Sequence, residues 1–460
     1  MVSSKKDFTQ GKLFWPIFLY TLPIIATGVL QLLYNMADQV VVGRFSGDAN
    51  ALGAVGSSAA LTSLFVNLFL GITAGTSVTV AQMLGAKKHD DVEKAVHTSI
   101  TFGVFLGVGL GALAFALAKP LLLLLGTKEE LLSLATSYVR IIACGMPFSA
   151  LYNFGAAILR SAGDSKTPLG ILSVTGILNV ALNLVFVIGF GMSVEGVALA
   201  TAIAHVASAA WVITLLSKRN EIYRLSFKKL KIHGASLRRI LRIGIPSAVQ
   251  SALFSISNMI IQSAVNTFST EEVSGFTAAG TIEGFTYISM NSFYQASVTF
   301  AGQNYGAKKR RRLSRVLLYT ILQVTVVGLL IGWLEIFFAE PLSAIFVDTS
   351  LPEAPLIVAA SVEKIKIILC CYFLCGIMEV MAGYLRGIGY SIAPMLCSVF
   401  GSCGIRAAWV FLVFPHLAHT TLSLYVVYIV SWLAVDLMHA VTILCANRKI
   451  KKSHLLDEVE

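Results

Sequence analysis

Asp38 is a carboxylate inside an apolar stretch long enough to cross a membrane. Gln31, Asn35 and Asp38 follow one another at spacings of four and three residues, which places them on one face of a helix. A charge at the centre of a bilayer costs about 2.5–3.5 kcal/mol even on the lenient insertion scale, so a charged residue there is a functional hypothesis by default. We therefore expect Asp38 to take part in handling an ion.

Two amides and a hydroxyl from later apolar stretches could complete this ion site. Asn179 and Asn183 form an i, i+4 pair on one helix face, and Thr201 lies in the next apolar stretch. If these faces converge on Asp38, they supply one carboxylate and several neutral oxygens, a set suited to hold a proton or Na⁺ away from water. We predict that Asp38, Asn179, Asn183 and Thr201 couple transport to an ion. The alternative for the three neutral residues is hydrogen bonding between helices.

The second half of the chain carries different polar groups. Glu379 and Arg406 place an acid and a base in apolar stretches, where they could neutralise each other. Such stretches also hold polar stripes, which are candidates for substrate contact, with structural hydrogen bonding as the alternative. The stripes consist of Ser251, Ser255, Asn258, Gln262 and Asn266 in one stretch and of Glu283, Tyr287, Asn291 and Gln295 in the next.

Sequence signatures of enzymes and ATPases are missing. The chain contains no G-x-x-x-x-G-K-[ST], no H-E-x-x-H and no G-x-S-x-G. Its seven cysteines lie in apolar stretches and form no C-x-x-C pair. We therefore expect no enzymatic activity and no cofactor, and we expect transport to be driven by a gradient of Na⁺ or H⁺.

The composition is that of a membrane protein. Of 460 residues, 56% are hydrophobic and only 13% are charged, and the mean hydropathy is +0.78. Soluble domains carry about 25% charged residues. A net charge of +11 would suggest nucleic acid in a soluble protein, but here the basic residues lie between apolar runs. We expect contact with a lipid bilayer and none with nucleic acid.

Twelve apolar runs reach spanning length, and they predict an all-α membrane protein because a bilayer cannot hydrogen-bond exposed backbone. Lys and Arg gather on one side of these runs, whereas the loops of the other side hold only Arg44, Lys119 and Lys128. By the positive-inside rule we predict that both termini are cytoplasmic. The predicted spans are 13–43, 50–82, 95–117, 131–158, 168–190, 196–216, 240–268, 274–301, 314–338, 357–385, 391–413 and 421–446.

Short strings from the first half of the chain recur in the second half. L-R-x-x-G-x-S-x-x-P occurs at 159–168 and 385–394, and Q-x-x-G-A-K-K occurs at 82–88 and 303–309. Echoes in the same order indicate a duplication, and an even number of spans per copy makes the copies parallel, with a pseudo-two-fold axis along the membrane normal. We predict an N-terminal six-helix lobe at 1–216, a basic cytoplasmic linker at 217–239 and a C-terminal six-helix lobe at 240–460.

These strings, together with the segments 34–43, 179–183 and 196–201, resemble the multidrug and toxic compound extrusion (MATE) family of cation-coupled drug antiporters. The resemblance covers nearly all of residues 10–446. It implies two six-helix lobes in a V-shaped fold that export amphipathic, often cationic, organic compounds in exchange for Na⁺ or H⁺. It also implies a bacterial protein of the cell membrane, which we expect to act as a monomer.

The resemblance assigns roles to the ion-site residues. Asp38 matches the family's acid in the first span, Asn179 its Asn in the fifth span and Thr201 its Thr in the sixth. Asn183 departs from the pattern, since the family often has a second acid there. One carboxylate fewer suits a single monovalent ion, and it argues against a proton scheme that uses two acids.

The substrate side departs further from the family pattern. Gln250 and Gly376 stand near positions at which many members have acids, and Glu379 lies one turn beyond Gly376. We predict a substrate cavity formed by Asn35, Asn153, Gln250, Asn258, Glu283, Tyr287, Asn291, Glu379 and Arg406.

Other classes of membrane protein remain as alternatives. A lipid-linked oligosaccharide flippase of related architecture is the first, although such carriers usually need a larger, more cationic cavity and often extra spans. A major-facilitator carrier should show G-x-x-x-D-R-x-G-R in its second loop, where residues 85–91 of this chain read GAKKHDD. A membrane enzyme is disfavoured by the missing catalytic residues.

Overall fold

A computed structural model describes residues 7–48, 50–347 and 352–452, and all regular structure in these ranges is helical. Ten of the helices are long and apolar enough to cross a membrane. Two further helices, Ala354–Leu369 and Tyr372–Gly387, meet at an angle of 48°, and they make an eleventh span if they are counted together as one. Over the described residues the all-α membrane fold predicted from the sequence is therefore confirmed. The predicted span 274–301 lies within a helix of 37 residues that is long enough to cross but is not among those apolar enough.

The chain divides into two compact units. Unit 1 consists of 1–7 and 26–248, and unit 2 consists of 8–25 and 249–460. The predicted six-helix lobes at 1–216 and 240–460, with the linker at 217–239 between them, stay a prediction. The chain ends, 1–6 and 453–460, for which a cytoplasmic location is predicted, lie outside the described residues.

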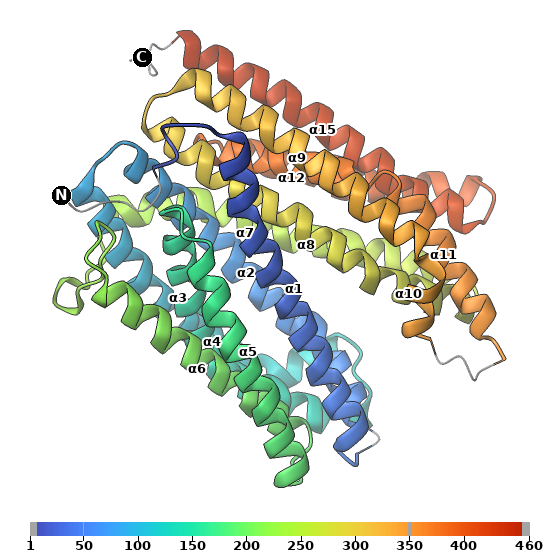
Figure 1. The fold of residues 1–460 in the computed structure, drawn as a ribbon. Coiled ribbons are helices and arrows are strands. Elements are labelled where there is room, and N and C mark those ends of the chain that lie inside the picture. Colours follow the sequence, from blue (N-terminus) through green and yellow to red (C-terminus); the bar gives the residue numbers. More distant parts are fainter. Residues whose placement is uncertain (1–6, 49, 348–351, 453–460) are drawn as a thin grey trace. The chain divides into compact units, whose positions relative to one another are not determined.

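Unit 1 is built from long helices that run side by side, with α4 packed against α2, α3 and α6, and α5 packed against α6 (Figure 1). A short 3₁₀ turn, η2, lies in the connection from α6 to α7. The elements of this unit are α2 (Ala51–Gly85), α3 (His89–Leu124), α4 (Glu129–Ser161), α5 (Lys166–Leu184), the π-helical η1 (Val185–Gly189), α6 (Val194–Lys218) and η2 (Phe227–Lys229).

Unit 2 is centred on α8, which packs against α9, α11 and α12, while α15 packs against α11 and α12 (Figure 1). Its elements are α8 (Thr270–Gly306), α9 (Arg310–Phe337), α10 (Ala339–Ile345), α11 (Ala354–Leu369), α12 (Tyr372–Gly387), α13 (Ile392–Ser398), the π-helical η3 (Val399–Gly404), α14 (Ile405–Ala408), the π-helical η4 (Trp409–Val413), the 3₁₀ turn η5 (Phe414–His416) and α15 (Thr421–Lys452).

Two helices belong partly to each unit. The boundary cuts α1 (Phe14–Phe45) after Ile25 and α7 (Gly234–Val265) after Ala248. Both cuts follow shortly after a proline, Pro23 in α1 and Pro246 in α7. Proline removes a backbone hydrogen bond inside a helix and bends it. The duplicated prolines therefore mark the places where each helix leaves one unit for the other.

Residues 8–25 belong to unit 2 because of specific contacts. The Phe8 ring stacks on Phe300 with centroids 4.0 Å apart, and the Phe8 backbone N–H donates to Gln303. Arg312 donates to the carbonyls of Phe8 and Gly11 at 3.0 and 2.8 Å. These bonds satisfy the carbonyls of a chain segment that precedes α1 and has no helical partners of its own.

The duplicated strings adopt the same backbone conformation in the two units. Lys87 and Lys308 both have positive φ angles, 53° and 60°. Gly163 and Gly389, which are also equivalent in the two strings, have φ angles of 88° and 93°. Positive φ is uncommon for a non-glycine residue, so its recurrence at equivalent lysines supports the duplication inferred from the sequence.

The corner between α4 and α5 is held by an ion pair. Arg219 lies 2.6 Å from the Asp164 carboxylate, and Thr167 donates to it through its hydroxyl and its backbone N–H. Burial raises the pKa of Asp164, but the hydrogen bonds from Thr167 and Arg219 outweigh it, so the pKa lies below its ordinary value. Tyr390 occupies the equivalent position of the second string.

Candidate functional site

The four residues predicted to couple transport to an ion meet in unit 1. The Asn183 amide donates to Asp38 Oδ1, and the Thr201 hydroxyl lies 3.5 Å from Asp38 Oδ2. Asn179 donates to Thr201 Oγ1 at 3.2 Å. The expected convergence of α1, α5 and α6 is therefore what the structure shows, although the role of the four residues in coupling stays a prediction.

Close helix packing brings these groups together. The Tyr34 ring of α1 packs directly against Gly176 of α5. A Cβ atom at position 176 would lie only 1.8 Å from this ring, so only glycine fits there. Ser208 of α6 donates to Thr175 of α5 at 2.9 Å. Asp38 follows Tyr34 by about one turn, and Asn183 follows Gly176 by about two, so this crossing aligns the carboxylate with the amide.

The chemistry of this cluster suits a small cation. Asp38 is its only carboxylate, and its other groups are neutral amides and a hydroxyl. Asn183 is fully buried, and its Oδ1 is a buried atom without a hydrogen-bond partner. A buried acceptor left without a partner costs free energy unless something binds it. Oxygen atoms are the ligands that hard cations prefer, so this residue set fits Na⁺, and the carboxylate alone fits a proton.

The substrate residues predicted for unit 2 occur in separate contacts. Glu283 of α8 lies 3.2 Å from Lys364 of α11, which also donates to the Phe276 carbonyl at 3.1 Å. Lys364 is 1% exposed and stands 3.5 Å from the Phe276 ring centroid. The sequence did not single out Lys364 as a partner, because nothing in its spacing links it to a helix far away in the chain.

Gln250 joins a second buried contact in unit 2. Its Oε1 accepts from Arg386 Nη2, and its amide donates to Ser398 at 2.9 Å. Arg386 also donates to the Tyr294 hydroxyl at 2.6 Å. The residue near the family's acid position in the seventh span is thus an amide that accepts from an arginine.

Arg406 and Asn258 form a third contact. Arg406 donates to Asn258 Oδ1 at 2.9 Å and to Ser431 Oγ at 3.2 Å. The neutralisation of Arg406 by Glu379 suggested by the sequence does not occur, because Arg406 makes no ion pair with the described carboxylates. The two residues lie on different helices, α12 and α14, and the guanidinium is taken up by neutral oxygens of α7 and α15.

The remaining predicted substrate residues make local contacts or none that the described part of the chain shows. Asn153 donates to the Ser149 carbonyl of its own helix at 2.9 Å, and Asn291 accepts from Gln295 at 3.3 Å. Asn35 is exposed on α1. Tyr287 and Glu379 are partly buried, on α8 and α12.

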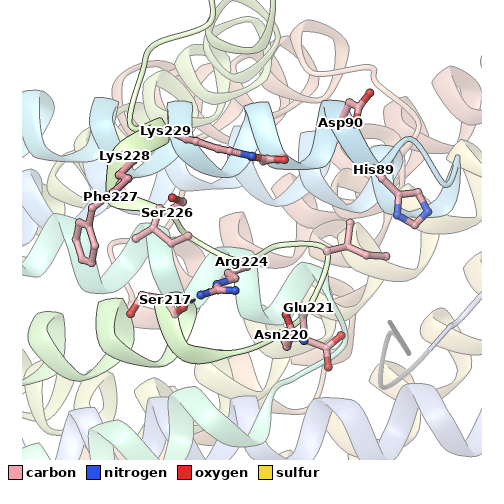
Figure 2. A pocket seen from close by; sticks show the side chains of 13 residues that line it. His89, Asp90, Ser217, Asn220, Glu221, Arg224, Ser226, Phe227, Lys228 and Lys229 are labelled. Atoms are coloured by element: carbon pink, nitrogen blue, oxygen red, sulfur yellow. Dashed lines mark hydrogen bonds and ion pairs between the residues drawn. The ribbon is translucent and has the colours of Figure 1, made fainter. Parts of the chain in front are cut away.

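A pocket of about 850 Å³ lies elsewhere, between the start of α3 and the linker that follows α6. Figure 2 shows His89 and Asp90 toward one end of it and Phe227 and Lys228 toward the other. The linker is pinned here by the Lys229–Glu93 ion pair at 2.6 Å. None of the residues predicted for the ion site or the substrate cavity lines this pocket.

A family model described as MatE matches residues 23–185 and 246–412, which together make up more than half of the chain. The chain belongs to the MatE family. The model matches one segment in each half, as a duplicated transporter requires. The MatE assignment confirms the family inferred from the sequence, and it makes the chain a multi-pass membrane transporter rather than an enzyme.

Two curated bacterial relatives are named as drug-resistance proteins. The probable multidrug resistance protein YoeA of Bacillus subtilis is 29% identical over 88% of this chain and 88% of its own. The probable multidrug resistance protein NorM of Thermotoga maritima is 30% identical over 82% of this chain and 80% of its own. These lengths show that the similarity to other MatE proteins extends over both halves of the chain.

A solved structure shares the fold. It is a multidrug resistance MATE family transporter of the MOP superfamily, 22% identical in sequence, with a TM-score of 0.90 over 98% of this chain and 100% of that one. At this identity the likeness shows the fold of the MatE chain and does not extend to its substrates.

Proposed function

We propose that this chain is a cation-coupled antiporter that exports amphipathic organic compounds, often cationic ones, by alternating access. The observation that carries the proposal is the Asp38 carboxylate, which lies within a spanning helix and accepts hydrogen bonds only from neutral Asn183 and Thr201 among the described residues. A carboxylate at membrane depth without a fixed counter-charge needs a mobile one. The entering Na⁺ or H⁺ supplies it.

The exchange follows from this electrostatic need. With Asp38 ionised, the cluster attracts a cation. The bound cation neutralises the cluster, so that no net charge has to cross the bilayer with the cluster when the protein changes conformation. One elementary charge is worth about 2.3 kcal/mol per 100 mV, and each 1.4 kcal/mol is tenfold. For an uncharged substrate, a single coupling ion driven by about 100 mV can therefore sustain an outward gradient of tens-fold. For a monovalent cationic substrate the one-for-one exchange is electroneutral, and the concentration gradient of the coupling ion drives it.

The proposal includes an orientation. Both termini are placed in the cytoplasm of a bacterial cell, because Lys and Arg concentrate in the tails and the even-numbered loops. The basic linker at 217–239 then lies on the cytoplasmic side. The chain is proposed to work as a monomer in the plasma membrane, with the substrate cavity formed by the nine residues predicted above.

The test is transport by the full-length protein in proteoliposomes, with Na⁺ and pH gradients imposed separately and ethidium as substrate. We expect one of the two gradients to drive ethidium movement. Asp38→Asn should abolish that movement while folding and reconstitution stay normal. Asp90→Asn serves as the matched control, because Asp90 is an exposed acid at the start of α3.

Two outcomes count against the proposal. Undiminished gradient-driven transport in Asp38→Asn would remove this residue from coupling. If neither gradient drives transport by the wild-type protein, with several organic cations tried, antiport itself is contradicted.

A further inference from the structure

Arg406 is a fully buried charge with neutral partners. Its side chain is 0% exposed and donates to Asn258 and Ser431. Its Nη2 is a buried nitrogen without a hydrogen-bond partner among the described residues. Because a buried charge is costly unless it is paired, an arginine in this condition needs a reason to be retained.

The guanidinium makes no ion pair with a carboxylate of the described residues. The ionisable groups that act on it most strongly are the phenols of Tyr428 and Tyr372 and the thiols of Cys375 and Cys403. All four are neutral at about pH 7. A buried lysine of the same unit, Lys364, has its carboxylate in Glu283, so the unit does pair a buried charge elsewhere.

Aromatic rings complete the environment. The guanidinium carbon lies 4.5 Å from the Tyr428 ring centroid and 5.3 Å from that of Phe254. Cation–π contact stabilises a guanidinium partly, but it uses the faces of the rings and leaves the N–H groups free to donate. The arrangement thus offers an unused donor beside two apolar surfaces.

The Arg406 contact reaches a residue at the surface. Asn258, which accepts from Arg406 Nη1, is exposed on α7. A carboxylate or phosphate that replaces the Asn258 carbonyl would place one oxygen on Nη1 and a second on the unpaired Nη2, which is the two-pronged geometry that arginine offers to such groups.

We propose that Arg406 is the anion-binding residue of a substrate subsite in unit 2, which takes aromatic organic compounds that carry a carboxylate or a phosphate group. The anionic group binds Nη1 and Nη2, and the aromatic part packs against Tyr428 and Phe254. The inference deepens the proposed export function, on which the word substrate rests. It widens the substrates from cations to aromatic anions and zwitterions.

The test measures equilibrium binding, which needs no ion gradient. Full-length protein in phosphatidylcholine nanodiscs is titrated with 1-pyrenebutyrate, with its uncharged methyl ester and with ethidium. Wild type should bind the carboxylate more tightly than the ester. Arg406→Gln should raise the Kd of pyrenebutyrate about ten- to a hundredfold, because a hydrogen-bonded charge pair is lost, and leave the Kd of the ester and of ethidium nearly unchanged.

Three further variants separate charge, position and folding. Arg406→Lys keeps the charge and should recover part of the affinity for pyrenebutyrate. Asn258→Asp leaves the arginine and its packing in place but supplies an internal carboxylate, which should compete with pyrenebutyrate and raise its Kd at least as much. Arg140→Gln is the matched control, because Arg140 is an exposed arginine that also lies over a ring, 5.2 Å from Phe115.

The proposal is overturned if Arg406→Gln and Asn258→Asp bind pyrenebutyrate like wild type, or if the ester loses affinity in parallel with the carboxylate. Phosphatidylglycerol that competes as strongly as pyrenebutyrate would assign the site to a lipid headgroup and would likewise overturn it. Binding is measured without a gradient, so its outcome does not depend on the coupling experiment. A failed coupling experiment with an intact Arg406 effect would thus reject the antiport proposal and leave this site standing.

Discussion

The two units differ in the partners of their buried charges. In unit 1 the charge at the centre of the polar cluster is the negative Asp38, surrounded by amides and a hydroxyl. In unit 2 Arg406 and Arg386 donate to neutral oxygens, while Lys364 pairs with Glu283 and the Glu335 carboxylate accepts from Thr286. One copy of the duplicated fold thus centres its polar cluster on an acid, and the other adds buried arginines to its acids. We expect that the first copy handles the ion and that the second recognises the charge of the solute.

Removing a paired charge should have the largest effect on stability. Glu283→Gln leaves Lys364 buried without its carboxylate, and breaking a buried ion pair in this way costs about 3–5 kcal/mol. Asp38→Asn leaves no orphaned charge, so its cost should be much smaller. Thermal unfolding in detergent compares the two, and Glu283→Gln with Lys364→Met should recover most of the loss. Equal stabilities of the two single variants would break the comparison.

Two threonine–carboxylate contacts, one in each unit, provide a matched pair. Thr286 donates to Glu335 at 2.7 Å, whereas Thr201 lies 3.5 Å from Asp38. Thr286→Val should cost about 1.5–3 kcal/mol, because a short hydrogen bond to a carboxylate is lost. Thr201→Val should cost less, about 1 kcal/mol, because its bond to Asp38 is at the distance limit and the bond that it accepts from Asn179 joins neutral groups. If the order of the two melting temperatures is reversed, the Asp38 contact is stronger than its geometry indicates.

Glycine-to-alanine substitutions in the two units should differ next in their cost in stability. Gly176→Ala drives a methyl group into the rigid ring of Tyr34 and should cost about 1–3 kcal/mol. Gly376→Ala meets the Met290 sulfur at 2.4 Å and Val324 Cγ2 at 2.6 Å. Both contacts are longer than the 1.8 Å to Tyr34, and the flexible thioether can move away, so the cost should be lower. Gly170→Ala is the control, because nothing lies within 4 Å of a Cβ there. Denaturant or thermal unfolding should rank Gly176→Ala as the worst of the three.

The smallest effect belongs to the Asp164–Arg219 pair. The pKa of Asp164 lies below its ordinary value of about 3.9, so the pair contributes stability above that pH and loses it as the pH falls through the folded-state pKa. Asp164→Asn should therefore lower stability near neutral pH by about 1 kcal/mol or less, as partly exposed pairs do. The difference from wild type should vanish in acid. A difference that grows as the pH falls would have the wrong sign for this pair.

The residues of the cluster around Asp38 could be singled out because their types and spacing are local, whereas their convergence rested on the family resemblance. Asn179 and Asn183 share a helix face by their spacing alone, and Asp38 stands out in an apolar run. The assignment of residues 8–25 to unit 2 was not predictable in that way. Continuity along the chain suggests that they pack with unit 1, and only the contacts of Phe8 with Phe300 and Gln303 decide otherwise.

The charge partners in unit 2 escaped prediction for a different reason. Lys364 and Glu283 lie on α11 and α8, and no periodicity within one helix reports a contact between two helices. The opposite charges of Arg406 and Glu379 suggested that the two residues pair, but Arg406 donates to neutral oxygens instead. The sequence gives the sign of each charge. The face of the helix on which the charged side chain lies depends on how regular the helix is.

That regularity fails next to Arg406, which occupies a short α-helical turn, Ile405–Ala408, between the π-helical segments Val399–Gly404 and Trp409–Val413. A π turn accommodates one residue more than an α turn, so the segment before Arg406 absorbs an extra residue without rotating the rest of the helix. With the same residues in a regular α-helix, everything after that segment would turn by about 100°, and the guanidinium would leave Tyr428 and Phe254. The placement of this arginine therefore depends on the backbone that precedes it as well as on the residue type at 406.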